Sequence, residues 1–363
     1  MFEKKPYLLL LCLLGFAMMF QACASTGTSG SAASTGTSGS AASSGTNNEP
    51  PWVRDPYAKY DKQANVAAIG FGSSREAAEK NAFGSLVAIF GQSIQVDEKV
   101  STSYQEAVKN GVTANWSENT AVDTTISTSA GMDSLVGAEI GDVWNDGKNT
   151  YYAVAVFNKA KASQIYSGMI KSNQAMIDNL VNIPAAEKNT MNGLARYQFV
   201  ATVADMTKPY INLLSVIGGS VPAFKNGDDY RLEALNITKA IPVGLTVQND
   251  KSGRIQGAFA KALSDLGFNS GGTNSQYMLD VVITTTPVEI ANNPYKFTRI
   301  ELKADLKDTK AGTVLLPFDF NSREGHSTQA EADNRAYIAA EQKINEEYSK
   351  LLSNYLFQLL PKK

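Results

Sequence analysis

The sequence predicts an α+β protein with two small domains, each a mainly antiparallel sheet packed with helices, joined by a helical hairpin. An order of strand, helix and further strands occurs twice, in residues 50–160 and 237–363. Residues 161–236 between them have apolar side chains at helical spacing. The folded part holds about 310 residues, more than one hydrophobic core usually supports, which also favours two domains.

The first domain is expected to begin with a strand and a helix. Val66-Ala67-Ala68-Ile69 is a short apolar strand, and Gly70-Phe71-Gly72 is expected to turn the chain. Ser73 and Glu76 have the spacing of a capping box, which predicts that a helix follows. The apolar face expected for this helix consists of Ala78, Ala82, Leu86, Ile89 and Phe90.

Four strands are predicted after this helix, over residues 93–105, 113–127, 135–144 and 150–157. Asp146-Gly147 is a turn signal between the last two, so these should form a hairpin. Residues 151–157 are apolar on both faces, which indicates a central strand.

The connecting region, residues 161–236, reads mostly as helix from Lys159 to about Ile217. Ile183-Pro184 should interrupt the helix, with a second helix from about Ala185. Pro209 is expected to end or kink that second helix, because proline lacks the amide hydrogen of the helical ladder.

The second domain, residues 237–363, should contain a strand over 241–247 and an amphipathic helix over 254–266 with Gly267 as its C-cap. Strands are predicted over 277–285, 295–306 and 313–320. Thr328 and Glu331 form a second capping box, which should open a helix from Gln329 to about Leu360.

Residues 1–22 have the pattern of a lipoprotein signal peptide. Lys4 and Lys5 precede an apolar stretch from Tyr7 to Phe20, which is too short to span a bilayer as a helix. Ala22 then precedes Cys23, the residue to which we assign lipid attachment by acyl chains such as palmitate. Phe20 and Gln21 depart from the usual lipobox. The alternative is an ordinary secretory signal cut near Ala22 or Ala24, with Cys23 incidental.

Residues 23–49 form the predicted lipidated cysteine and linker. Ala24 to Thr46 contains only Ala, Ser, Thr and Gly and includes the repeat STGTSGSAA twice in tandem. Such a chain is expected to be a flexible coil with a reach on the order of 25 Å. Ala24 is not the aspartate that marks inner-membrane retention. We therefore expect a lipid-anchored protein of the bacterial cell envelope, at the outer membrane, with a periplasmic or external body.

Composition excludes several classes of function. The chain has 33 basic and 35 acidic residues, a net charge of −2, so no basic excess favours nucleic acid. Cys23 would be the only cysteine of the mature chain, so no internal disulfide can form. The single histidine, His326, lies in a polar stretch and is expected in an exposed loop. We therefore predict no metal, no cofactor and no catalytic residue.

Other candidate sites have simpler structural explanations. Gly70-Phe71-Gly72 lacks the third glycine of a dinucleotide fingerprint and the lysine of a phosphate loop. The carboxylates Asp97 and Glu98, and Glu331 and Asp333, lie on polar faces without the pairing of an acid and a base. Trp116 is interpreted as a sheet-face aromatic residue, with an exposed contact residue as the alternative.

The first domain resembles the Lpp-twenty lipoprotein family, a module similar to the N-terminal domain of the flagellar assembly protein FlgT. The resemblance rests on the segments Pro51-Trp52-Val53, Ala68 to Gly72, Ser74 to Ala78 with Ala82, Val143-Trp144, and Tyr151 to Val154. It departs from the family at Asn81, where arginine is common. The resemblance implies an α+β fold without catalytic residues.

The second domain looks similar to the α+β modules of curli-secretion and penicillin-binding-protein-activator lipoproteins (CsgG-like and LpoB-like). The shared features are Leu266-Gly267-Phe268, a strand after Tyr277, the turn from Asp308 to Gly312, and the long final helix. Together these features predict a non-enzymatic scaffold or assembly protein that binds envelope proteins. The alternatives are a ligand-binding envelope lipoprotein and a cell-wall hydrolase.

Overall fold

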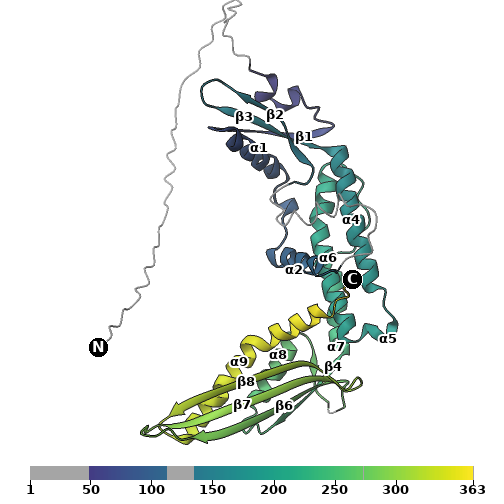
Figure 1. Ribbon diagram of the computed structural model, residues 1–363. Helices are drawn as coiled ribbons and strands as arrows, with labels where there is room; N and C mark the ends of the chain where they lie inside the picture. Colours follow the sequence, from purple (N-terminus) through teal and green to yellow (C-terminus); the bar gives the residue numbers. More distant parts are fainter. Residues whose placement is uncertain (1–48, 113–134, 273, 363) are drawn as a thin grey trace, which may run out of the picture. The chain divides into compact units, whose positions relative to one another are not determined.

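A computed structural model of the chain describes residues 49–112, 135–272 and 274–362 (Figure 1). It has two sheets with helices packed on them, so the predicted α+β class is confirmed. Residues 48–363 form one compact unit. The division at residues 160 and 236 stays a prediction.

The first sheet has the strand order β1-β3-β2, and both pairings are antiparallel. The predicted hairpin and the central position of its second strand, β3, are therefore confirmed. One long helix, α1, packs on this sheet, and two short 3₁₀ helices precede it. The bounds are η1 Pro51–Val53, η2 Pro56–Ala58, β1 Asn65–Gly72, α1 Arg75–Phe90, β2 Ala138–Asn145 and β3 Tyr151–Asn158.

Glycine brings β1 into close contact with α1. A Cβ atom at Gly70 would lie 2.0 Å from the backbone nitrogen of Ala82, so only glycine fits there. Asn81, the departure from the family pattern, donates a hydrogen bond to the Phe71 carbonyl at 2.8 Å. Residues 70–72 thus belong to the strand, and the prediction of a turn there was wrong.

The start and the buried face of α1 also differ from expectation. Ser74, one residue after the predicted Ser73, caps the helix by accepting a hydrogen bond from the amide of Ala77 at 3.2 Å. The buried residues are the expected ones except Ile89, which is 52% exposed. Ile89 lies at the edge of the apolar stripe, where a small rotation of the helix decides burial.

The strand predicted over residues 93–105 is wrong, because this segment forms η3 Gly91–Ile94 and α2 Glu98–Lys109. The Asp97 carboxylate caps α2 and accepts the amides of Lys99 and Val100 at 2.9 and 3.4 Å. Tyr104 and Ala107 are buried at helical spacing. The strand predicted over 113–127 lies outside the described residues.

The connecting region is helical, as predicted, with an interruption at residues 182–184. Pro209 does not end the second helix, which continues for about two further turns to Val216. Gly218, at φ 76°, follows the end of the helix. Buried side chains before and after Pro209 hold the helix across the missing hydrogen bond. The bounds are α4 Lys159–Val181, α5 Ala185–Lys188, α6 Met191–Val216 and α7 Gly227–Ala240.

The second sheet has the order β5-β4-β6-β7-β8. The pairings of β4 with β5 and with β6 are parallel, and the other two are antiparallel. The long helix α9 packs against β7, β8 and α8, and Thr328 caps it as predicted. The bounds are β4 Pro242–Gln248, α8 Arg254–Asp265, β5 Asn269–Ser270, β6 Tyr277–Val288, β7 Lys296–Asp308, β8 Thr313–His326 and α9 Gln329–Gln358.

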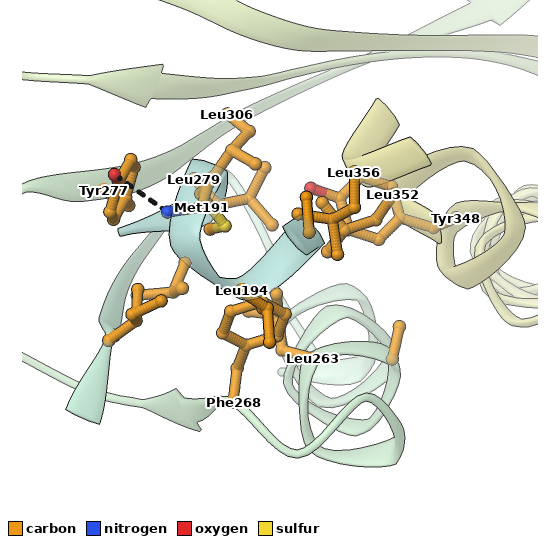
Figure 2. Packing of buried hydrophobic residues seen from close by; sticks show 14 of the residues in the cluster. Met191, Leu194, Leu263, Phe268, Tyr277, Leu279, Leu306, Tyr348, Leu352 and Leu356 are labelled. Carbon is orange, nitrogen blue, oxygen red and sulfur yellow. Dashed lines mark hydrogen bonds between the residues drawn. The ribbon is translucent and has the colours of Figure 1, made fainter. Parts of the chain in front are cut away.

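Helix α6 contributes to two hydrophobic cores. Figure 2 shows its first turn among side chains of the second sheet, α8 and α9, where the Met191 amide donates a hydrogen bond to the Tyr277 hydroxyl at 3.2 Å. At its other end, Leu213 and Leu214 belong to the core under the first sheet. One helix therefore links both α+β parts through buried contacts.

Candidate functional site

The lipid-attachment residue Cys23 lies outside the described residues, as does Trp116. The assignment of Cys23 therefore stays a prediction. Among the helices that the structure describes, none combines the length and the hydropathy required of a membrane span.

His326 is the last residue of β8 rather than part of an exposed loop, and it is partly buried. The prediction of a loop was wrong because β8 extends six residues beyond the predicted strand end and pairs with Lys296 at His326. Its Nδ1 atom lies 3.4 Å from the Thr328 amide, beside the start of α9. No group of three or more His, Cys, Asp or Glu side chains that could hold a metal occurs among the described residues.

The carboxylates singled out in the sequence have local structural contacts. Asp97 is the N-cap of α2. Asp333 accepts hydrogen bonds from Thr298 and from Gln329, the latter at 2.9 Å. Glu331 pairs with Arg335 at 3.7 Å within α9. These contacts explain the residues as caps and helix pairs, so they supply no argument for acid–base chemistry.

The first sheet is covered differently on its two faces. Helix α1 lies on one face, where Ala153, Ala155 and Phe157 of β3 are fully buried. On the opposite face, residues 50–60 form a segment that we call the strap. Its Trp52 is only 4% exposed and belongs to one small core with Val154 and Val156.

A polar contact fastens the strap to the edge strand β2. The Tyr60 hydroxyl and the Lys59 ammonium group both donate to the same oxygen of Asp142, each at 2.5 Å. A Cβ atom at the neighbouring Gly141, which lies at a bulge, would be 2.3 Å from the Tyr60 oxygen, so a larger residue there would displace the Tyr60 side chain. Burial, reinforced by the Asp142 charge, raises the pKa of Tyr60, so its hydroxyl stays a donor.

Three aromatic side chains cross the same face of the sheet, and two of them, Trp144 and Tyr152, pack against the small core that includes Trp52. Phe71 on β1 pairs with Tyr152 on β3, and Tyr152 pairs with Trp144 on β2. We call these three residues the aromatic row. The ring centroids of Phe71 and Tyr152 are 6.4 Å apart, and those of Trp144 and Tyr152 are 5.5 Å apart. Phe71 is 66% exposed, and the other two are partly exposed.

The aromatic row has the chemistry of a contact surface. Large apolar rings lose water favourably when a partner covers them, and tryptophan and tyrosine add hydrogen-bond donors at their tips. The Trp144 indole and the Tyr152 hydroxyl have no hydrogen-bond partner among the described residues. The row contains no nucleophile and no general base, so it supports binding rather than catalysis.

Sequence reasoning missed this surface although it named all three residues. From the sequence, Phe71 is expected in a turn, and Trp144 and Tyr152 are expected in neighbouring strands without a shared surface. Alternation along β1 and β3 places Phe71 with Ala67 and Tyr152 with Val154, on the face away from α1. That periodicity could have shown that the three rings share one face, but not that the strap leaves Phe71 exposed.

The arrangement of strap, glycine contact and aromatic pairs coincides with a sequence match to a known family. Residues 50–158 match the model of the LPP20 lipoprotein family. This part of the chain is an LPP20 domain. The resemblance proposed for the first domain is thereby confirmed, and the chain is a lipoprotein of the cell envelope. The resemblance of the second domain to curli-secretion and penicillin-binding-protein-activator lipoproteins stays a prediction.

Several solved structures are similar to this chain at low sequence identity. The secreted protein HP1454 from Helicobacter pylori is 14% identical, with 77% of this chain and 97% of that chain covered and a TM-score of 0.38. A minor lipoprotein from Acinetobacter baumannii is 14% identical, with 34% and 98% covered and a TM-score of 0.25. A lipoprotein from Caulobacter crescentus is 13% identical, with 33% and 93% covered and a TM-score of 0.25. No curated protein matches the sequence.

Proposed function

We propose that this protein is lipid-anchored through Cys23 at the outer membrane and acts as a non-enzymatic scaffold or assembly protein. In this proposal the aromatic row of the LPP20 domain is the surface that contacts another envelope protein. A linker of the Ser, Thr, Gly and Ala composition found after Cys23 is expected to let the LPP20 domain reach that partner.

The exposure of the aromatic row is the observation that carries the proposal. A phenylalanine that is 66% exposed beside two further rings leaves apolar area in water, which burial against a partner would remove. Protein contact surfaces are enriched in such aromatic residues at their centre. The LPP20 match adds that this sheet belongs to a lipoprotein family.

Site-specific crosslinking in native membranes tests the contact. A photo-reactive phenylalanine analogue in place of Phe71 should give a discrete protein adduct, and the adduct should weaken when Trp144 is changed to Ala. The same analogue in place of Tyr295, which is 55% exposed at the other sheet, is the matched control. Equal adducts at both positions, or none at Phe71, would contradict the proposal.

The lipid anchor needs a separate test. Cells supplied with a palmitate analogue should label the wild-type protein, and the Cys23→Ala variant should carry no label. Fractionation of the labelled membranes then reports whether the protein is in the outer membrane. Absence of label on the wild type would favour the ordinary secretory signal instead.

A further inference from the structure

A cavity with a volume of about 760 Å³ lies between α2 and the C-terminal turns of α9. We call it the α2–α9 cleft. A smaller recess of about 120 Å³ shares Ser103, Ser353 and Phe357 with it and extends to α6. Small-molecule sites commonly have volumes of about 300–1,000 Å³, so the cleft has the size of a ligand site.

Buried contacts fix both helices that form the walls of the cleft. The Tyr104 hydroxyl of α2 donates to Asn173 of α4 at 2.8 Å, and Asn173 donates to Thr207 of α6 at 2.8 Å. These buried hydrogen bonds fix α2 against the helical connector. Leu352 and Leu356 are buried beneath the other wall. The two helices that form the walls are therefore held in place by contacts outside the cleft.

Each wall presents a stripe of polar side chains, in which Glu106 is the one charged member among the described residues. Ser103, Glu106 and Asn110 are spaced three and four residues apart on α2, so they share one helix face. Asn354 and Gln358 are four residues apart on α9 and line the opposite wall. The amides of Asn110, Asn354 and Gln358 are exposed and have no hydrogen-bond partner among the described residues. Each amide can both donate and accept.

An aromatic ring lies among these amides. Phe357 lines the cleft, is partly exposed, and packs edge-on against the buried Phe199 with centroids 6.4 Å apart and an interplanar angle of 83°. The contact with Phe199 fixes the position of the Phe357 ring. The ring can therefore offer an apolar surface to a ligand whose remaining edges are polar.

The charges exclude several ligand classes. The cleft has one acidic side chain, Glu106, and one basic side chain, Lys362, so no excess of either sign favours an anion or a cation. Among the described residues that line the cleft, only Phe357 and Val112 are apolar, too few to cover an acyl chain. A ligand with many hydroxyl groups and an apolar ring face matches the amides and the phenylalanine best, because hydroxyls also both donate and accept.

We propose that the α2–α9 cleft binds a neutral oligosaccharide, with Asn110, Asn354 and Gln358 bonding its hydroxyl groups and Phe357 stacking on one sugar ring. Because Asn110, Asn354 and Gln358 are exposed at the mouth of the cleft, a longer glycan can lie across it. The site does not involve the aromatic row, so its failure would leave the proposed contact of that row untouched.

Calorimetric titration of the full-length protein, kept in a detergent without a sugar headgroup, tests this site with two probes. The probes are the tetramer of N-acetylglucosamine and maltotetraose. At least one should bind, and Gln358→Ala should raise its Kd about fivefold, the effect of losing one hydrogen bond. Gln342→Ala removes the same side chain type from an exposed position on the same helix outside the cleft and should leave the Kd unchanged.

Three outcomes would overturn the proposal. The first is that neither tetrasaccharide binds at millimolar concentration. The second is that the Gln358→Ala and Gln342→Ala variants bind the sugar with equal affinity. The third is that Asn110→Ala leaves the Kd unaltered. Thermal unfolding of each variant should match the wild type because all three side chains are exposed. A folded variant without the expected loss therefore counts directly against the site.

Discussion

The two sheets differ in what they present on the face that no long helix covers. On β7 of the second sheet, Arg299, Glu301 and Lys303 point to this face and are exposed, as alternation in an antiparallel strand predicts. On the first sheet the corresponding face has the strap and the aromatic row. Charged residues keep a sheet face in water, whereas exposed rings favour a partner. The difference points to the LPP20 domain as the region of contact.

The largest expected effect concerns the core of the second sheet and its connection to the first. Phe259 is fully buried, with its ring centroid 4.9 Å from that of Tyr348. Phe259→Ala should lower the free energy of unfolding by about 3–5 kcal/mol through lost burial and a cavity. Urea unfolding followed by tryptophan fluorescence and by circular dichroism would measure it.

The same experiment reports whether the two cores unfold together. All three tryptophans lie between residues 50 and 158, so their fluorescence reports on the first region only. Because α6 contributes to both cores, Phe259→Ala should shift the fluorescence midpoint together with the circular dichroism midpoint. An unchanged fluorescence midpoint would show that the two regions are energetically independent.

A smaller loss is expected from a glycine in the first region. Gly70→Ala places a methyl group against the backbone of α1 and should cost about 1–3 kcal/mol or more. Gly84→Ala, on the same helix with no atom within 4 Å of the added methyl group, should instead stabilise by about 0.5–1 kcal/mol. Thermal unfolding of both variants would check the opposite signs; a similar loss in both would disprove the close contact.

The fastening of the strap predicts a modest effect of pH. Burial alone would raise the pKa of Asp142, but hydrogen bonds from Lys59 and Tyr60 outweigh it, so the pKa lies below its ordinary 3.8. A lowered pKa stabilises the fold above pH 3.8, and this contribution is lost as the pH falls through the folded value. Asp142→Asn should destabilise by about 1 kcal/mol at pH 7 and weaken the loss of stability on acidification.

Unfolding between pH 6 and 3 would measure this effect. Asp305→Asn, on the uncovered face of the second sheet, is the matched control and should leave the acid dependence unchanged. An identical acid response of Asp142→Asn and wild type would show that the strap is not held through this carboxylate.

The smallest change in stability is expected from substitutions on the two uncovered sheet faces, where only partner binding should differ. Phe71→Ser in the aromatic row and Val282→Ser, a 40% exposed position on the second sheet, should each change the free energy of unfolding by less than about 0.5 kcal/mol. Only Phe71→Ser should reduce recovery of crosslinked partner from native membranes. Equal recovery with both variants would remove the functional distinction between the sheets.

Much of the fold could be predicted from local patterns. The hairpin around Asp146-Gly147, the cap at Thr328 and the alternation of Leu279, Val281 and Ile283 all depend on neighbours in the sequence, and each was confirmed. Residues 93–105 were misassigned because their short alternating stretch also fits a helix once Asp97 provides a cap.

Features that depend on distant segments could not be predicted. Burial on both sides of Pro209 maintains α6, and pairing with β7 extends β8 to His326. The aromatic row similarly requires knowledge of which side chains the strap covers. The α2–α9 cleft combines side chains more than 240 residues apart in the sequence.

Helix α6 shows that the segment matched by the family model and the hydrophobic core beneath the first sheet have different extents. The LPP20 match ends at residue 158, yet the core beneath that sheet also includes Tyr166 and Met169 of α4 and Leu213 and Leu214 of α6. A chain that ended with the match would lose the contact between Phe157 and Tyr166, whose ring centroids are 6.3 Å apart, and would leave part of this core in water. The matched segment is therefore shorter than the hydrophobic core to which it belongs, and the helices that follow it supply part of its interior.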